Sequence, residues 1–467
     1  MDVDLQSLFA RAAQVAADHR TGVGVRPVQP DEADEQLRAS FGGPLQTGPT
    51  PPEQVLDELV QAARPGLMGT VGPRFFGFVT GGALPAASAA DLVSVGWDQC
   101  AYNEVLSPAA AAAERGAGGW LKTLLGIPSA ASVGFVTGAQ AANTVGLAVG
   151  RHGVLAGAGW DVEQDGLSGA PRVRIVASEE RHATIDRAAR LLGFGLTSIE
   201  SVRADVNGAI SIEGLREVLA ASSGPTIVCL QAGNVNTGAC DDLAAAIPMA
   251  REVGAWVHVD GAFGLWAAAS PRTAHLVAGL ELADSWGTDA HKWLNVPYDS
   301  GLVFCADPVM HRDTMHYSAA YLTGSGSGGV AADYVLGDLT PESSRRARGF
   351  AVWAALRELG SDGVADLVDR CCVLARRMAA ALVAGGATIH NDIVLNQVLV
   401  SFPAGEDGRD RTDAIIERVQ LDGTCWVGGT TWRGQRLMRV SVSNAATTER
   451  DIDTSAVAIL QAVAQEA

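Results

Sequence analysis

Lysine is almost missing from this sequence. Only Lys122 and Lys292 occur among the 34 basic residues of the 467-residue chain, and all the others are arginine. A guanidinium group replaces an ammonium group in most roles, but only a primary amine forms an imine with a carbonyl compound. Lys292 stands between His291 and Trp293, behind an apolar segment. We therefore interpret Lys292 as an imine-forming residue rather than a surface lysine.

Positive charge and long apolar runs are also scarce. The formal net charge of -18 argues against nucleic acid or an anionic membrane as a partner, because both would be repelled. No apolar run reaches the length of about 18 residues that a membrane helix needs. The first residues, Met1 to Leu5, are acidic and lack the positively charged head of a signal peptide. We expect a cytoplasmic protein.

Paired cysteine motifs are absent. The seven cysteines are an odd number, are scattered, and form no CxxC pair. This spacing indicates neither a disulfide framework nor a zinc knuckle, so we expect reduced thiols and no metal site.

The chain is long enough for several packed units, and its 48% hydrophobic content is that of a globular protein. We predict three parts: an N-terminal arm (1–80), a large domain (81–345) and a small C-terminal domain (346–467). Apolar residues at helical spacing from Leu5 to Val15 predict one helix in the arm. Thr50 to Glu53 has the spacing of a capping box and predicts the start of another. We expect the arm to pack on another subunit.

Beyond residue 120, apolar strand-like runs alternate with helical spans. This alternation predicts crossover units and a mostly parallel sheet with helices on both faces. The predicted strands are 133–136, 173–176, 227–230, 256–260 and 302–305. In such sheets, functional side chains gather at the carboxyl ends of the strands.

Polar residues follow several of these strands and are predicted to converge. Asp260 ends one strand, where a carboxylate can hold a proton on a pyridine nitrogen. The turn from Thr137 to Gln140 opens a helix, whose free N–H groups suit a phosphate. His182 follows another strand and can stack on a flat ring. With the amine of Lys292, these groups describe a site for pyridoxal 5′-phosphate (PLP).

The C-terminal third begins with a Gly/Ser-rich segment, 321–334, which we interpret as a mobile lid that carries Tyr334; a plain linker is the open alternative. A helix is predicted from Thr340–Glu342 to Gly360, and a second one from Ser361 to about Val383. Strands and helices of a smaller α+β unit follow.

The sequence resembles the group II PLP-dependent decarboxylases, which include glutamate, histidine and aromatic amino-acid decarboxylases. The resemblance runs from about residue 55 to the C-terminus, and its last part is most similar to glutamate decarboxylases. The motifs that carry it are Pro73–Phe76, Ser178–His182 with Leu192–Gly195, Val259–Phe263, Asp289–Trp293 and Met438–Asn444 with Asp451–Asp453. It implies the fold-type I PLP-dependent transferase fold, with a large PLP-binding domain, a smaller α+β domain and an N-terminal helical arm.

The resemblance also implies a role for each matching residue. Lys292 would form the Schiff base with PLP, and Asp260 would pair with the ring nitrogen. Ala262 would pack beneath the ring and His182 above it. The phosphate would be held by Gly138, Ala139, Gln140 and His291. Tyr334 would protonate the substrate carbon after carbon dioxide leaves.

Substrate and partner expectations follow from the same resemblance. Arg439 matches a position that meets a substrate carboxylate in some members, whereas Phe78 and its neighbouring loop indicate an apolar side-chain pocket; the choice between them stays open. Members are homodimers with shared active sites. Three departures weaken the match. Gly233–Val235 lacks a hydroxyl that family members often have, alanines at 110–112 replace polar residues, and the spacing from Tyr334 to Arg345–Arg346 differs.

The predicted function is therefore PLP-dependent decarboxylation of an L-amino acid to an amine and carbon dioxide. Two alternatives use the same cofactor. One is decarboxylation-dependent oxidative deamination, which gives an aldehyde, and the other is a carbon–carbon lyase reaction like that of sphingosine-phosphate lyases. Intact Lys292, Asp260 and His182 argue against a non-catalytic protein that merely keeps the fold.

Overall fold

The computed structural model describes residues 4–30, 34–221, 223–317, 335–405 and 410–466. The chain divides into two compact units. The large unit contains residues 83–376 and 391–398, and the small unit contains residues 1–82, 377–390 and 399–467. This division into two units does not test the three-part scheme predicted from the sequence, which stays a prediction.

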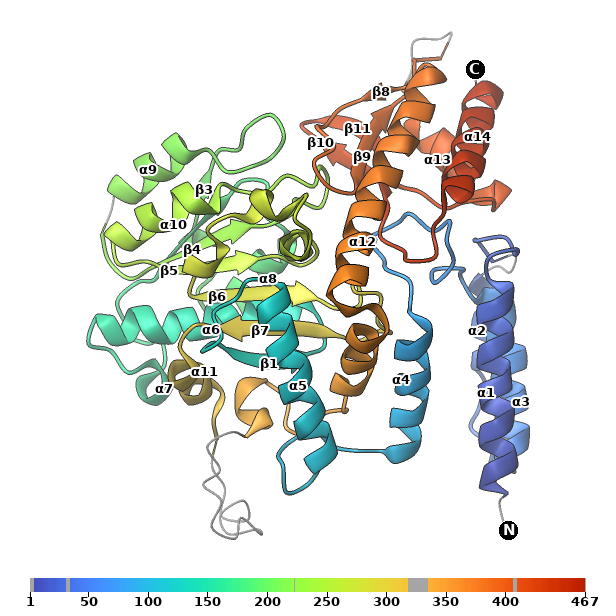
Figure 1. Cartoon of the computed structure of the whole chain (residues 1–467), viewed down its shortest axis with the longest axis horizontal. Coiled ribbons are helices and arrows are strands. Elements are labelled where there is room, and N and C mark those ends of the chain that lie inside the picture. The colour runs from blue at the N-terminus through green and yellow to red at the C-terminus, as the bar shows by residue number, and fades with distance from the viewer. Residues whose placement is uncertain (1–3, 31–33, 222, 318–334, 406–409, 467) are drawn as a thin grey trace. The chain divides into compact units, whose positions relative to one another are not determined.

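A seven-stranded sheet is the centre of the large unit (Figure 1). Its strand order is β1-β7-β6-β5-β4-β2-β3. Neighbouring strands are parallel except around β7, which is antiparallel to both β1 and β6. The strands are β1 (Ser132–Val136), β2 (Arg174–Ser178), β3 (Ile199–Val202), β4 (Thr226–Gln231), β5 (Trp256–Asp260), β6 (Ser285–Asp289) and β7 (Gly301–Cys305). The predicted mostly parallel sheet is confirmed.

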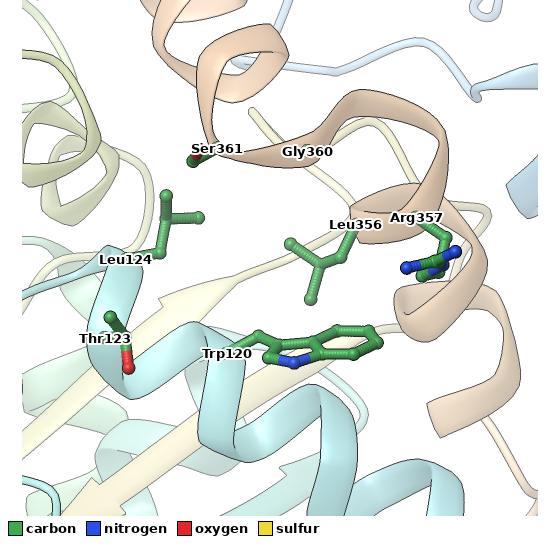
Figure 2. Close-up of a pocket in the computed structure, with 7 residues that line it drawn as sticks. All are labelled: Trp120, Thr123, Leu124, Leu356, Arg357, Gly360 and Ser361. Carbon is green, nitrogen blue, oxygen red and sulfur yellow. The ribbon is translucent and has the colours of Figure 1, made fainter.

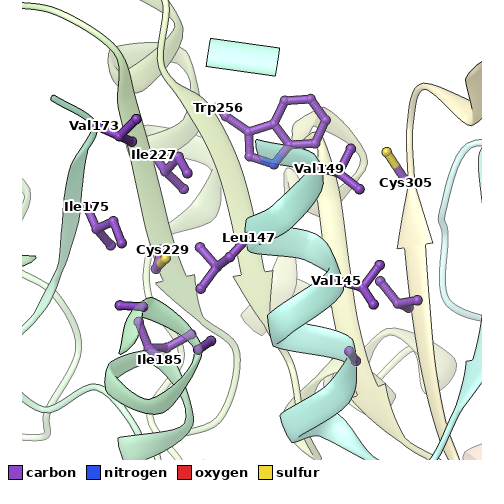
Figure 3. Close-up of a cluster of buried hydrophobic side chains, with 14 of the residues drawn as sticks. Val145, Leu147, Val149, Val173, Ile175, Ile185, Ile227, Cys229, Trp256 and Cys305 are labelled. Carbon is purple, nitrogen blue, oxygen red and sulfur yellow. The ribbon is translucent and has the colours of Figure 1, made fainter. Parts of the chain in front are cut away.

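Helices cover both faces of this sheet. Every residue of β1, β2, β4, β5, β6 and β7 is buried, which requires protein on each side. Figure 3 shows one of these layers, in which Leu147 of helix α6 (Ala139–Gly157) points toward Ile227 and Cys229 of β4. Burying a side chain such as Leu147 stabilises the fold by roughly 1.5–3 kcal/mol.

The remaining helices of the large unit connect its strands or flank the sheet. β2 is linked to β3 by α8, β3 to β4 by α9, and β4 to β5 by α10, as crossover connections of parallel strands require. Their bounds are α4 (Pro85–Trp97), α5 (Pro108–Leu124), α7 (Val162–Asp165), α8 (Ala183–Leu191), α9 (Ile212–Ala220), α10 (Leu243–Glu252) and α11 (Pro308–Met315).

The long helix α12 (Gly349–Ala384) is broken at Gly360, whose φ of 62° lies in the left-handed region. Glycine adopts this conformation without a side-chain clash. The prediction of two helices that meet at Gly360 is confirmed. The predicted start at Thr340–Glu342 was wrong. The segment before Gly349 is not helical: the backbone carbonyl of Arg345 accepts a hydrogen bond from the Ala101 N–H at 2.9 Å instead.

The small unit contains a four-stranded sheet of order β10-β11-β9-β8. Its strands are β8 (Thr388–Ile389), β9 (Gln397–Ser401), β10 (Gly428–Trp432) and β11 (Gln435–Ser441), and its C-terminal helices are α13 (Thr412–Asp422) and α14 (Glu449–Gln465). A capping box between Thr448 and Asp451 begins α14. The α+β character predicted for this part is confirmed.

The N-terminal segment of the small unit forms α1 (Leu5–Gly22), α2 (Asp34–Phe41) and α3 (Pro52–Ala63). The capping box predicted for α3 is absent, because Pro51 occupies the N-cap position and makes no side-chain hydrogen bond. Neither α1 nor α3 contains a buried residue. Among the helices of the described residues, none combines the length and apolarity that crossing a bilayer requires.

Candidate active site

The predicted cofactor residues follow or end four strands of the large sheet, β1, β2, β5 and β6, of which β5 and β6 are neighbours. Thr137–Gln140 follow β1, His182 follows β2, Asp260 ends β5, and Lys292 follows β6. The parallel pairing of β5 with β6 places Asp260 opposite Gly287, two residues before the end of β6. The structure thus brings together residues that are up to 155 positions apart (292 − 137).

Lys292 is partly buried beside a carboxylate. Its Nζ atom lies 2.9 Å from Oδ2 of Asp289, and its side chain is 21% exposed. The tight turn that carries Lys292 is closed by a hydrogen bond from the Asn295 N–H to the Lys292 carbonyl at 3.2 Å. The amine is therefore held at the strand edge while part of it stays accessible to a reactant.

Asp289 was not predicted as a site residue, although it belongs to the motif around Lys292. Its side chain is only 3% exposed. Oδ1 accepts a hydrogen bond from the Ala139 N–H at 2.5 Å, at the start of α6, and lies 3.4 Å from Nε2 of His291. Asp289 ends β6, which was not among the predicted strands, so the sequence signal was only its place three residues before Lys292. Asp289 joins the lysine, the histidine and the first turn of α6.

His291 has a defined tautomer. The Ser300 N–H donates to Nδ1 at 3.1 Å, so the proton of the neutral ring is on Nε2, the atom that faces Asp289. The ring packs on Tyr298 with 4.4 Å between centroids. Burial is the main reason that the pKa of His291 is lowered. A neutral His291 can donate one hydrogen bond through Nε2.

Two glycines let the turn after β1 approach its neighbours. A Cβ atom on Gly138 would lie 3.2 Å from the His291 ring, and one on Gly301 would lie 2.4 Å from the Gly138 Cα atom. The second contact is impossible without backbone movement. Gln140 of the same turn donates from Nε2 to the Thr184 carbonyl at 3.3 Å, which fixes the turn to α8.

Asp260 is a buried carboxylate, 4% exposed. It accepts hydrogen bonds from the Ala262 N–H at 3.2 Å and the Thr184 hydroxyl at 3.4 Å. Burial raises its pKa, while the charges of His182 and Lys292 and hydrogen bonds, including one from Asn143, lower it. The donors that reach Asp260 are neutral, so a protonated ring nitrogen would supply the cation that this carboxylate needs. The residues present fit PLP in this respect.

His182 caps α8 and is exposed. Its Nδ1 atom accepts a hydrogen bond from the Thr184 N–H at 3.2 Å and lies 3.0 Å from the Thr184 hydroxyl. These contacts orient the imidazole ring at the site edge. Ala262, two residues after Asp260, is half-buried.

The departure at Gly233–Val235 has a structural explanation. Oδ1 of Asn234 accepts hydrogen bonds from the N–H groups of Asn236 at 2.9 Å and Thr237 at 3.3 Å. Its Nδ2 donates to the Glu180 carbonyl at 3.1 Å. The Asn234 side chain therefore closes the loop after β4, where related enzymes often carry a hydroxyl.

The three remaining predicted residues are not part of the described large unit. Phe78 and Arg439 belong to the small unit. Phe78 is 68% exposed and stacks on Trp426 with centroids 5.3 Å apart, and burial lowers the pKa of Arg439. Tyr334 lies outside the described residues.

The family model named pyridoxal-dependent decarboxylase conserved domain matches residues 35–402 of the chain. The chain belongs to this decarboxylase family. Its cofactor is PLP, and its activity is that of a PLP-dependent carboxy-lyase acting on an amino acid. The fold-type I architecture and the group II resemblance are both confirmed.

Relatives of this decarboxylase match over most of their length. Tryptophan decarboxylase 1 of Oryza sativa subsp. japonica is 27% identical, and the alignment covers 96% of this chain and 91% of the relative. A 4-hydroxyphenylacetaldehyde synthase of Rhodiola rosea is 25% identical, with 92% and 88% covered. The crystal structure of Oryza sativa TDC with PLP and tryptamine superposes with a TM-score of 0.90 at 24% identity, covering 99% of this chain and 98% of that one.

Proposed function

We propose that this decarboxylase converts an aromatic L-amino acid to its amine and carbon dioxide at the site around Lys292. The observation that carries this proposal is the placement of the Lys292 amine and the buried Asp260 carboxylate on adjacent strands, with the first turn of α6 linked to Lys292 through Asp289. Lys292 would hold the PLP aldehyde, Asp260 the ring nitrogen, and Ala262 and His182 the two faces of the ring. Gly138, Ala139, Gln140 and His291 would hold the phosphate.

When bound, PLP supplies an aldehyde that condenses with amines and a protonated ring that withdraws electrons as carbon dioxide leaves. Asp260 holds the proton at the ring nitrogen, and its burial strengthens that interaction. Asp289 orients the Nζ atom of Lys292, which lies 2.9 Å from its Oδ2 atom. The positive end of α6 favours an anion. In this structure its Ala139 N–H and Nε2 of His291 both face the Asp289 carboxylate. Tyr334 would donate the proton that the substrate α-carbon takes up.

The substrate class rests on the relatives. The Oryza sativa relative is named for tryptophan. The predicted substrate contacts do not decide the matter, because Phe78 favours an apolar side chain and Arg439 an acidic group, and both stay predictions. The relatives favour the aromatic class.

A substrate panel tests this function. The purified enzyme with PLP should be offered L-tryptophan, L-tyrosine, L-phenylalanine, L-glutamate and L-aspartate, and carbon dioxide, amine and peroxide should be measured together. We expect carbon dioxide and amine in equal amounts from an aromatic substrate, without peroxide. Faster turnover of glutamate or aspartate would contradict the aromatic assignment, and an aldehyde formed without carbon dioxide would indicate a carbon–carbon lyase.

A second function is favoured by the relative from Rhodiola rosea, whose name is that of an aldehyde synthase. In that reaction an amino acid, oxygen and water give an aldehyde, carbon dioxide, ammonia and hydrogen peroxide. The same panel separates the two functions, because one peroxide would form for each carbon dioxide.

We also propose a homodimer with shared active sites. A face of the large unit formed by α4, α5 and α12 carries exposed tryptophans: Trp97 is 56% exposed, and Trp120 and Trp353 are 42% exposed each. Two hollows mark this face. One of about 320 Å³ is lined by Trp120 and Leu124 of α5 and Leu356 of α12 (Figure 2), and one of about 560 Å³ is lined mainly by alanines and aromatic rings. A partner surface of matching shape would bury these rings.

Replacing Trp353 with aspartate tests the dimer. We expect the wild-type enzyme to sediment as a dimer and the Trp353→Asp variant to shift toward monomer by at least about tenfold in dissociation constant, since a charge would enter an apolar interface. Val253, which is 46% exposed and lies outside this face, provides the control Val253→Asp. Sedimentation velocity checks both. A monomeric wild type, or a Trp353→Asp variant as dimeric as the control, would refute the proposed interface.

A further inference from the structure

A chain of buried hydrogen bonds runs from Asp260 into the core of the large unit. The Thr184 hydroxyl lies 3.4 Å from Oδ2 of Asp260, and Nδ2 of Asn143 donates to that hydroxyl at 3.0 Å. Oδ1 of Asn143 lies 3.0 Å from Nε2 of His258, and Nδ1 of His258 lies 2.9 Å from the Ser285 hydroxyl. The cofactor assignments do not account for these residues beyond Asp260.

The donor and acceptor of each hydrogen bond in this series can be assigned by starting from its last member, Trp256. The indole N–H of Trp256, which can only donate, reaches the Ser285 hydroxyl at 2.9 Å. The Ser285 hydroxyl can in turn donate to Nδ1 of His258. Nε2 faces the Asn143 Oδ1 atom, which can only accept, so the ring proton is on Nε2. That N–H donates to Oδ1 of Asn143. The Asn143 amide nitrogen is thereby turned toward Thr184 and Asp260.

Packing and burial keep this arrangement fixed. Asn143, His258 and Ser285 are all fully buried. Burial lowers the pKa of His258 to about 3, so the ring is neutral at pH 7. A Cβ atom on Gly146 would lie 2.4 Å from the His258 ring, and one on Gly287 would lie 2.7 Å from Oδ1 of Asn143. The ring and the amide therefore pack directly against backbone.

The orientation of Asn143 matters for Asp260. The Asn143 amide nitrogen donates to the Thr184 hydroxyl at 3.0 Å, so the proton of that hydroxyl is directed at Oδ2 of Asp260, 3.4 Å away. A flipped amide would present its oxygen to the Thr184 hydroxyl, which would then donate its proton to Asn143 instead of Asp260. Asn143 on its own can adopt either orientation, and the partner that decides is the N–H of His258.

We propose that His258 is a positioning residue for the cofactor, which acts by fixing Asn143 so that its amide nitrogen directs the Thr184 hydroxyl, and through it the Asp260 carboxylate, toward the ring nitrogen. This inference rests on the proposed role of Asp260. His258 touches neither the cofactor nor the substrate in this scheme. Its effect should therefore appear in PLP binding and in the protonation of the ring, before any catalysis takes place.

The test is the His258→Phe variant of the full chain, which removes the donor and keeps an aromatic ring. PLP affinity is measured by titrating the apoenzyme, and the protonation of ring-nitrogen-labelled PLP by its ¹⁵N chemical shift. We expect affinity to fall about tenfold, the scale of one lost buried hydrogen bond, and the shift to move toward that of neutral pyridine. Ser285→Ala, which deletes only a hydroxyl, should move both in the same direction by less, and it decides the question if His258→Phe does not fold.

His311 provides a matched control. It is also fully buried, with its Nδ1 atom 2.8 Å from the Ser132 hydroxyl and its Nε2 atom 3.1 Å from the Leu339 carbonyl, but these partners do not lead to Asp260. His311→Phe should lower thermal stability and leave PLP affinity and the ¹⁵N shift unchanged. Equal effects of the His258 and His311 variants on PLP would overturn the proposal.

Asp260→Asn separates the failure of this inference from failure of the proposed function. If Asp260→Asn changes the ring-nitrogen shift while His258→Phe and Ser285→Ala do not, Asp260 keeps its role and the positioning by His258 is refuted. If Asp260→Asn itself leaves the shift and the affinity unchanged, the assignment of Asp260 fails, and the positioning role fails with it.

Discussion

Replacing Lys292 with alanine is expected to lower kcat by roughly 10⁴-fold or more and to abolish covalent attachment of PLP. The reason is chemical: no other side chain at this edge of the sheet is a primary amine, and an imine cannot form without one. Visible absorbance of the purified protein and carbon dioxide release with an aromatic substrate check the two effects.

Lys122 is the control for this experiment because it is the other lysine of the chain. Its Nζ atom donates to the carbonyls of Ser129 at 2.6 Å and Ala131 at 2.8 Å, so its role is to tie down the end of α5. Lys122→Ala should lose about 1–3 kcal/mol of stability from two hydrogen bonds and keep its bound chromophore and turnover. A Lys292→Ala enzyme with normal activity would refute the proposed mechanism.

Replacing Asp260 with asparagine is expected to lower kcat by about 10³-fold, which corresponds to roughly 4 kcal/mol of transition-state stabilisation. An amide cannot keep the ring nitrogen protonated, so the ring would withdraw electrons less well as carbon dioxide leaves. The covalent link through Lys292 should survive. Steady-state kinetics and the spectrum of the bound cofactor therefore distinguish this variant from Lys292→Ala.

Asp284 is the control for Asp260. It directly precedes β6 and contacts β5 at the end opposite to Asp260. It accepts a hydrogen bond from the Val257 N–H at 2.7 Å, and burial raises its pKa. Asp284→Asn should change stability and leave kcat within about twofold. Equal losses of kcat in the two variants would mean that Asp260 has a structural role only.

Much of the fold could be predicted because its central strands are apolar runs that end in polar residues. β5 is such a strand, and Asp260 was identified from its place at the end of it. β6 was missed, because Ser285, Gly287 and Thr288 do not look like a strand in isolation; they are buried by the helices and strands around them. Lys292 was nevertheless identified, since the scarcity of lysine does not depend on secondary structure.

Other features depend on packing that no local pattern encodes. Asn143 lies inside α6 and His258 inside β5, where residue type alone gives no direction to a side chain. Asp289 ends β6, the strand that was missed, so both its position at a strand end and its contact with the Ala139 N–H required the structure. The start of α12 was misplaced because a tertiary hydrogen bond at Arg345 outweighs local helix preference.

The most direct test of the Lys292 assignment is chemical mapping. The enzyme with PLP should be reduced with borohydride, digested, and searched by mass spectrometry for the pyridoxyl group. With only two lysines in the chain, the outcome is unambiguous. We expect the label on the peptide that contains Lys292 and none on the peptide that contains Lys122; a label on Lys122, or on neither lysine, would contradict the proposed site.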